Sequence, residues 1–152
     1  MQMNGKKTPK LELTAEERAA FKRQKIKIAD LADYSVEELC SRLRLSQPRA
    51  RELRALAEFQ RIPSIGPQFA RDMVELGYHS LEELKQQDGA QLFDAMEQRY
   101  GFEIDPCVED QCRLIVDFAR HRDSSRQWWD FTAERKQYRD KYGYPPNRPK
   151  KE

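Results

Sequence analysis

The sequence has few of the residues that build β-sheets and none of the long apolar runs that cross membranes. Only three threonines and four valines occur among its 152 residues, so a sheet would lack its usual β-branched side chains. No apolar run approaches the roughly 18–20 residues of a membrane-spanning helix. The first residues also lack the basic, apolar and small-residue succession of a signal peptide. We therefore expect no all-β fold, no membrane partner and a cytoplasmic location.

Cysteine is scarce as well, and catalytic constellations are missing. The three cysteines are an odd number, which argues against a disulfide framework. Cys107 and Cys112 are five residues apart, and on one helix their side chains would diverge by about 140°. No C-x-x-C or H-x-x-E-H spacing occurs, and no Ser/His/Asp set or phosphate-binding lysine loop is recognisable. We expect two buried cysteines, no metal site, no cofactor and no enzymatic activity.

The net charge of +2 hides a strong partition along the chain. Residues 1–61 hold 14 Lys+Arg against 9 Asp+Glu, and residues 118–152 hold 10 against 5. Residues 62–117 hold 4 against 12. A polyanion such as DNA would therefore face the two basic ends. The acidic middle could equally attract the basic ends of its own chain or of a neighbour.

Helix signals follow one another through most of the chain. Thr14–Glu17, Ser35–Glu38 and Ser80–Glu83 each have the spacing of a capping box, in which a hydroxyl and a carboxylate satisfy helix amides reciprocally. Pro48, Pro67 and the pair Asp105-Pro106 are typical of first helical turns, Asp88 of an N-cap, and Gly77 and Gly101 of helix ends. A last helix is expected from near Ser125, carrying Trp128, Trp129 and Phe131.

These signals predict one all-α domain over residues 14–140, a compact helical bundle. Residues 1–13 and 141–152 lack periodicity and are expected to be disordered basic tails. Adjacent helical residues point about 100° apart, so Trp128 and Trp129 cannot share one flat face, and at least one should pack in the core. A repeat at an offset of 45 residues aligns Tyr34–Leu39 with His79–Leu84, through either duplicated units or two independent capped helices.

The most informative stretch is Phe59–Ala70, where one helix ends and another begins at Pro67. Turn amides beside a helix N-terminus favour an anion, because they converge and the helix dipole is positive there. This stretch resembles the helix-hairpin-helix motif of SAM-like units, with Ile65 and Gly66 as the apolar residue and second glycine of the hairpin. Ser64 stands where a first glycine is usual, and Gln68 where a lysine is common.

A wider resemblance covers residues 55–132. The order of this hairpin, then Asp105–Asp110, then Trp128–Phe131 resembles the bacterial helix-hairpin-helix family of pathogenicity locus proteins, some labelled mitomycin-resistance proteins. The resemblance implies a fold of helix-hairpin-helix-like units. It carries no enzymatic activity over to this chain.

The resemblance also implies where DNA would be contacted. Hairpin amides of Ser64, Gly66 and Phe69 would hold a phosphate, and the carbonyls of Gln60, Ile62 and Ile65 could hold a monovalent cation. The full predicted DNA-binding set is Ser64, Ile65, Gly66, Pro67, Gln68, Phe69, Arg49, Arg54, Arg61 and Arg71. Other basic positions before the hairpin are Arg42, Arg44 and Arg51, and those of the C-terminal end are Arg135, Lys136, Arg139, Lys141, Arg148, Lys150 and Lys151.

The expected function is a non-enzymatic, sequence-nonspecific DNA-binding or DNA-associated accessory module. The alternative is a protein-interaction adaptor that uses the same helical scaffold without touching nucleic acid. In that alternative the hairpin serves only to pack two helices. The sequence does not specify an oligomeric state.

Overall fold

All regular secondary structure in the described residues, 7–151 of the computed structural model, is helical. This confirms the predicted all-α fold. The elements are α1 (Ala15–Arg23), the 3-10 helix η1 (Ile28–Asp33), α2 (Val36–Leu43), α3 (Gln47–Gln60), α4 (Pro67–Glu75), α5 (Leu81–Leu84), α6 (Gly89–Tyr100), α7 (Pro106–His121), the 3-10 helix η2 (Trp128–Phe131) and α8 (Thr132–Tyr142). Within the described range, no helix combines the length and apolar character that a membrane crossing demands.

Local capping chemistry explains why the helices begin where they do. Thr14 and Ser35 each accept a hydrogen bond from the amide three residues later, and the glutamate there accepts one from the cap amide in return. Ser80 accepts from the amide of Glu83, but the Glu83 carboxylate accepts from the amide of His79 instead. Two of the three predicted capping boxes are therefore confirmed as reciprocal.

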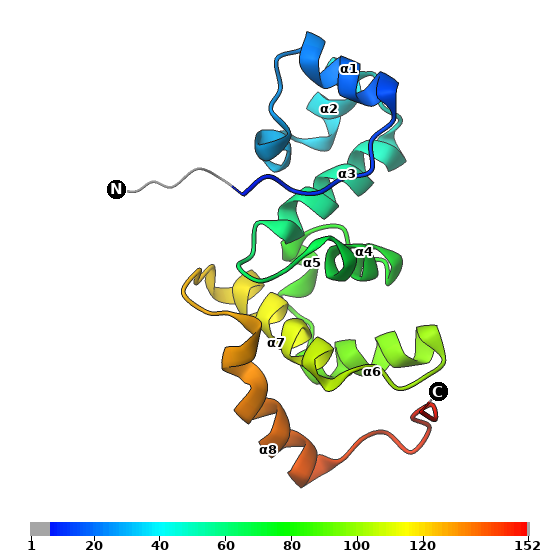
Figure 1. The fold of residues 1–152 in the computed structure, drawn as a ribbon, viewed down its shortest axis with the longest axis vertical. Helices are drawn as coiled ribbons and strands as arrows, with labels where there is room; N and C mark the ends of the chain where they lie inside the picture. The colour runs from blue at the N-terminus through cyan, green and yellow to red at the C-terminus, as the bar shows by residue number, and fades with distance from the viewer. Residues whose placement is uncertain (1–6, 152) are drawn as a thin grey trace.

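Helix α3 contributes to both hydrophobic clusters and lies between α1–α2 on one side and α4–α5 on the other (Figure 1). Ala50, Leu53 and Ala57 pack with α1, η1 and α2. Leu56 and Phe59, on another side of the same helix, pack with the turn after α3 and with α4 to α7. One long helix thus fixes the position of the α1–α2 end relative to the remainder of the protein.

Residues 7–13 follow a defined extended path across α3, where the sequence predicted part of a disordered tail (Figure 1). The buried Gln60 side chain explains this path. Its Oε1 accepts from the amide of Lys10 at 2.9 Å, and its Nε2 donates to the Lys10 carbonyl at 3.0 Å. Pro9 is buried, and Leu11 packs against both clusters. Residues 1–6 of the predicted tail lie outside the described residues.

The C-terminal end also differs from the expected tail. Instead of one helix from Ser125, a 3-10 turn over residues 128–131 precedes α8. No side chain within Thr132–Tyr142 is buried, so α8 contributes little to the apolar core. Residues 143–151 return towards α6, where the amide of Glu103 donates to the Lys150 carbonyl at 3.3 Å. Residue 152 lies outside the described residues.

Ion pairs to buried carboxylates hold this end in place. Arg135 donates to Asp110 at 3.0 Å, Arg139 to Glu109 at 2.9 Å and Arg148 to Glu97 at 2.9 Å. The three carboxylates are at most 1% exposed. The acidic middle of the chain therefore binds the basic C-terminal end of the same chain, which is one of the two arrangements expected from the charge partition.

The cysteines only partly match their prediction. Cys112 is buried, as expected, and its thiol lies 3.7 Å from the sulfur of Met96. Cys107 is exposed, so the prediction that it is buried is wrong. It occupies the first turn of α7, beside the capping Asp105, on a side of the helix that faces solvent.

Candidate nucleic-acid interface

The turn between α3 and α4 is built around Ser64, the serine at the usual glycine position. Its backbone has φ of 64°, in the left-handed region that disfavours residues with a Cβ. Its hydroxyl donates to the Pro63 carbonyl at 2.6 Å and accepts from the amide of Trp128 at 3.0 Å. The strained serine thus links the turn to η2.

The amides predicted to hold a phosphate lie in this turn and in the first turn of α4. Gly66 caps α4 in an extended conformation without a side-chain acceptor, and Pro67 occupies the first helical turn. Within residues 7–151, no acceptor receives a hydrogen bond from the amides of Ser64, Gly66 or Phe69. A phosphate at these amides stays a prediction.

Two of the three carbonyls predicted to hold a monovalent cation, those of Ile62 and Ile65, accept from protein donors instead. The ammonium of Lys7 donates to the Ile65 carbonyl at 2.8 Å, and the amide of Ile65 donates to the Ile62 carbonyl at 3.1 Å. Burial lowers the pKa of Lys7. A positive group of the chain itself therefore contacts one of the three carbonyls.

The predicted phosphate-neutralising arginines are all bound to other groups of the protein. Arg49 donates to both carboxylate oxygens of Glu17 at 2.8 and 2.9 Å and to Glu52 at 2.7 Å. Arg71 donates to the other oxygen of Glu52 at 2.7 Å. These pairs connect α1, α3 and α4. The hydrogen bonds that Arg49 donates to Glu17 lower the pKa of the Glu17 carboxyl to about 2.

Arg54 and Arg61 have equally local partners. Arg54 donates to the Tyr34 carbonyl at 2.9 Å. Arg61 donates to the Ala29 carbonyl at 3.0 Å and to the Asp33 carboxylate at 2.8 Å. Both guanidinium groups thus hold η1, together with its C-cap residue Tyr34, against α3. A phosphate would have to compete with these internal contacts.

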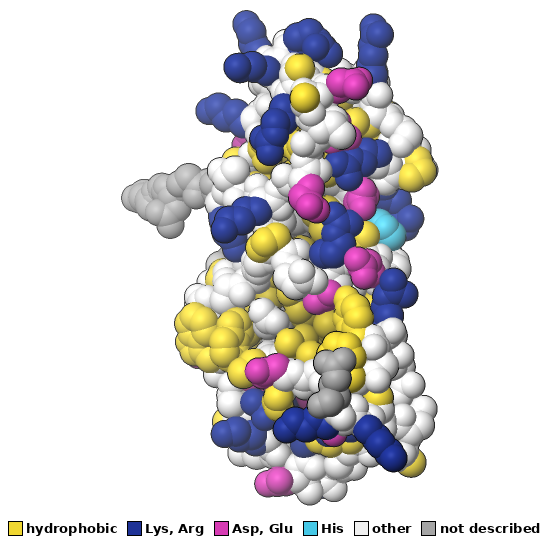
Figure 2. Space-filling view, turned by 45° about the vertical axis from the view of Figure 1, so that its right-hand side comes forward, with side chains coloured by type: hydrophobic (Ala, Val, Ile, Leu, Met, Phe, Trp, Pro, Cys, Tyr) yellow, Lys and Arg dark blue, Asp and Glu magenta, His cyan; other side chains and the backbone are white. Residues whose placement is uncertain are grey.

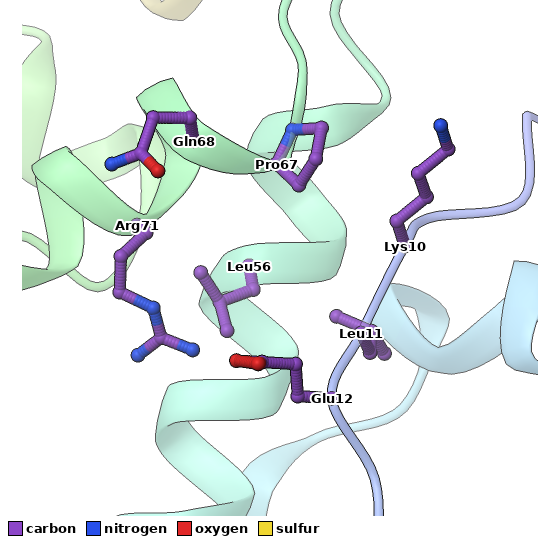
Figure 3. A pocket seen from close by; sticks show the side chains of 7 residues that line it. All are labelled: Lys10, Leu11, Glu12, Leu56, Pro67, Gln68 and Arg71. Atoms are coloured by element: carbon purple, nitrogen blue, oxygen red, sulfur yellow. The ribbon is translucent and has the colours of Figure 1, made fainter.

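A cavity of about 390 Å³ lies beside the first turn of α4 (Figure 3). Pro67, Gln68 and Arg71 line one side, and residues 10–12 of the N-terminal segment line the other, across Leu56. Lys10 brings a cation to this cavity, but Glu12 brings a carboxylate and Arg71 is paired with Glu52. The mixed charge gives an anion little net attraction.

A more uniform basic surface lies at the end of the molecule formed by α1 and α2. We call residues 22–27 and 42–44 the basic end; neither stretch contains an aspartate or glutamate. Its cations are Lys22, Arg23, Lys25, Lys27, Arg42 and Arg44, all exposed. Figure 2 shows Lys and Arg side chains gathered over this end of the molecule. None of the six forms an ion pair within residues 7–151.

Three of these cations surround one cavity. Arg23, Arg42 and Arg44, together with Gln24 and Leu43, line a space of about 340 Å³ where the C-terminal ends of α1 and α2 meet. Arg42 is positioned by a hydrogen bond to the Gln24 carbonyl at 3.3 Å and by the Tyr34 ring beneath its guanidinium. Arg44 ends α2 in a left-handed conformation, with φ of 57°. The lining contains guanidinium groups and no carboxylate.

The α1 members of this surface were not among the candidate site residues predicted from the sequence. Arg42 and Arg44 were among the basic positions named before the hairpin. Lys22, Arg23 and Lys25 were not, because they lie about twenty residues earlier in the sequence. The available signal was the concentration of cations in the last turns of two helices, where the helix dipole also favours positive charge.

The tryptophans occupy different environments. Trp128 is half-buried and packs against the larger hydrophobic cluster, which confirms that one of the two indoles contributes to the core. Trp129 is 55% exposed, and the two rings meet edge to face with centroids 5.4 Å apart. Trp128 therefore anchors η2 beside Ser64, while Trp129 faces solvent.

Comparison with known proteins places this fold in a family. The chain matches the family described as Pathogenicity locus over residues 52–137, more than half of its length. It is 32% identical to the mitomycin resistance protein McrB of Streptomyces lavendulae over 73 residues, which are 48% of this chain and 69% of the relative. No solved structure matches it. The matched region runs from α3 to α8 and contains the α3–α4 turn, and the chain belongs to the Pathogenicity locus family.

Proposed function

We propose that the protein is a non-enzymatic, sequence-nonspecific DNA-associated module whose main contact surface is the basic end. The observation that carries this proposal is the cavity lined by Arg23, Arg42 and Arg44 without a carboxylate. Guanidinium groups bind phosphate oxygens through paired hydrogen bonds, and they read no base sequence when they do so. In this proposal the α3–α4 turn has a mainly structural role: it joins α3 to α4 and contacts η2 through Ser64.

Charge availability supports the basic end over the hairpin arginines. Arg49, Arg54, Arg61 and Arg71 already bind carboxylates or carbonyls of the protein, so a phosphate would gain their charge only by displacing those groups. The cations of the basic end have no such carboxylate partners within residues 7–151. They can neutralise phosphates without breaking internal ion pairs.

Fluorescence anisotropy against duplex DNA at several salt concentrations tests this proposal. Each neutralised phosphate on B-DNA contributes about −0.9 to the slope of log affinity against log salt, so three arginine contacts give a slope near about −3. The triple variant Arg23→Gln, Arg42→Gln, Arg44→Gln should weaken binding to duplexes of every sequence at least about tenfold and flatten that slope.

The matched control removes the same charge from the opposite end. Lys136→Gln, Lys150→Gln, Lys151→Gln changes three exposed cations with no ion pair within residues 7–151. Its affinity should stay within about twofold of the parent protein if the basic end dominates. Equal losses in the two triple variants would contradict the assigned surface, and salt-insensitive or absent DNA binding would contradict the function.

A protein-interaction adaptor is the second candidate, and the exposed aromatic side chains favour it. Trp129 and Tyr142 are 55% and 62% exposed, the largest exposed hydrophobic side chains in the described residues. Tryptophan and tyrosine contribute much of the binding energy at protein interfaces. Trp129→Ala would then abolish capture of a protein partner while leaving DNA anisotropy unchanged.

A further inference from the structure

A groove separate from the basic end lies between α4, α6 and the beginning of α7. Its volume is about 210 Å³, suited to a single-ring compound. Most of its lining is apolar or aromatic, and the residues of this kind are Met96, Tyr100, Phe102, Ile104 and Val108. Gln68 and Asp72 of α4 provide its polar groups. Small-molecule sites typically combine apolar walls with a few polar groups in this way.

Asp72 is the chemically distinctive member of this groove. It is 9% exposed, and one carboxylate oxygen, Oδ1, accepts both from the Tyr100 hydroxyl at 2.5 Å and from Gln68 Nε2 at 3.1 Å. Within residues 7–151, no donor contacts the other oxygen, Oδ2, and no cation forms an ion pair with Asp72. A buried carboxylate therefore has one oxygen without a partner.

The other buried carboxylates show how this protein normally neutralises such groups. Glu97, Glu109 and Asp110 each bind an arginine. Burying a charge without a counter-charge is costly, whereas pairing it recovers much of the penalty. Asp72 has only neutral donors, so the missing component at this site is a cation.

Tyr100 cannot supply that charge. Burial and then the neighbouring Asp72 carboxylate raise the pKa of Tyr100 well above its ordinary value, so its hydroxyl stays protonated and donates to Oδ1. The exposed carboxylate of Glu75, on the same helix, pairs with Arg99 at 3.7 Å, so the negative charge of this groove is that of Asp72. Phosphate groups are therefore disfavoured here, and organic cations are favoured.

We propose that this groove binds a small aromatic cation. The ring would pack against Met96, Tyr100 and Phe102, where sulfur–aromatic and ring–ring contacts are available. Its ammonium or amidinium group would donate to Oδ2 of Asp72. This binding is independent of the proposed DNA contact, because it uses a different surface and the opposite ligand charge.

Isothermal titration calorimetry of the full chain tests the proposal with benzamidine and its neutral counterpart benzamide. The two probes have nearly the same shape and differ in charge. We expect benzamidine to bind at least tenfold more tightly than benzamide. Asp72→Asn, which keeps the shape and removes the charge, should abolish this preference, whereas Glu75→Gln, on the same helix but exposed, should retain it.

A second variant keeps the test decisive if Asp72→Asn unfolds, which circular dichroism would reveal. Tyr100→Phe keeps the ring wall and the Asp72 charge and removes one donor from Oδ1. Its preference for benzamidine should persist or increase. Equal binding of the two probes to the parent protein, a preference retained in folded Asp72→Asn, or a preference lost in Tyr100→Phe would each overturn the proposal.

Discussion

The two ends of the molecule use positive charge in opposite ways. At the basic end, six exposed cations have no ion pair within residues 7–151, and three of them surround one cavity. At the α6–α8 end, Arg135, Arg139 and Arg148 neutralise carboxylates that are almost fully buried. The same residue type is therefore available to a partner at one end and part of the fold at the other. Counting arginines does not distinguish these roles.

The largest expected effect comes from removing an arginine of the C-terminal end. Arg139 donates to Glu109, Asp94 and the Gly143 carbonyl. Arg139→Met keeps most of the side-chain volume but leaves buried Glu109 with fewer counter-charges. We expect the free energy of unfolding to fall by about 3 kcal/mol, the low end for a broken buried pair, because Arg113 still binds Glu109. Urea denaturation measures this change.

Arg44→Met provides the corresponding change at the basic end. Arg44 is exposed and has no ion pair within residues 7–151, so the loss should stay below about 0.5 kcal/mol. Similar losses in Arg44→Met and Arg139→Met would show that the two ends do not differ in this way.

A smaller loss of stability is expected at the two adjacent tryptophans, and it should differ between them. Trp128 packs against the core and its amide bonds Ser64, whereas Trp129 is mostly exposed. Trp128→Ala should cost about 2 kcal/mol, less than full burial would give, and Trp129→Ala below about 1 kcal/mol. Acrylamide quenching of Trp128→Phe and Trp129→Phe gives a second readout. The indole left in Trp128→Phe should be the more accessible, and the reverse order would contradict these positions.

The stability contributed by the Glu17–Arg49 pair, which joins α1 to α3, should fall at acidic pH. Hydrogen bonds from Arg49 lower the folded-state pKa of Glu17 to about 2, below its unfolded value of 4.5. A depressed carboxyl pKa contributes stability that is complete above the unfolded pKa and is lost as pH falls through the folded one. Stability should therefore fall by about 1 kcal/mol between about pH 5 and 2 through this pair. Glu17→Gln should remove that part of the pH dependence in thermal melts, whereas exposed Glu16→Gln should not.

The smallest effect concerns the turn between α3 and α4. Ser64→Gly relieves a left-handed backbone, worth about 1 kcal/mol, but loses the hydroxyl that accepts from the Trp128 amide, also worth about 1 kcal/mol. The two effects should nearly cancel. Ser64→Ala keeps the strain, loses the hydrogen bond, and should be less stable than Ser64→Gly by about 1 kcal/mol. Equal melting temperatures for the two variants would show that the backbone strain is negligible.

Local signals predicted the helices well because each rests on neighbouring residues. The cap at Asp88, the helix beginning at Pro67 and the left-handed glycines at positions 77 and 101 all occur as expected. The start of α8 was missed because a 3-10 turn precedes it, held by the local pair Gln127–Asp130 and by the distant hydrogen bond from the Trp128 amide to Ser64, 64 residues earlier. The path of residues 7–13 likewise depends on the distant side chain of Gln60.

The candidate interface was harder to predict from the sequence, because it too depends on contacts between residues far apart along the chain. The charge partition correctly anticipated that acidic and basic segments of the chain could attract each other. The charge partition could not show which arginines form ion pairs with carboxylates, because those pairs join residues up to 51 positions apart. The basic end became visible only when α1 and α2 brought Arg23 and Arg44 to one cavity.

The most direct test of the contrast between the two ends is an NMR titration of the arginine side-chain Nε–H signals with a short DNA duplex. We expect the signals of Arg23, Arg42 and Arg44 to shift progressively and to recover on addition of salt. The signals of Arg135, Arg139 and Arg148, which are bound to internal carboxylates, should stay unchanged. Shifts confined to Arg135, Arg139 and Arg148, or to the hairpin arginines Arg54 and Arg61, would contradict the account.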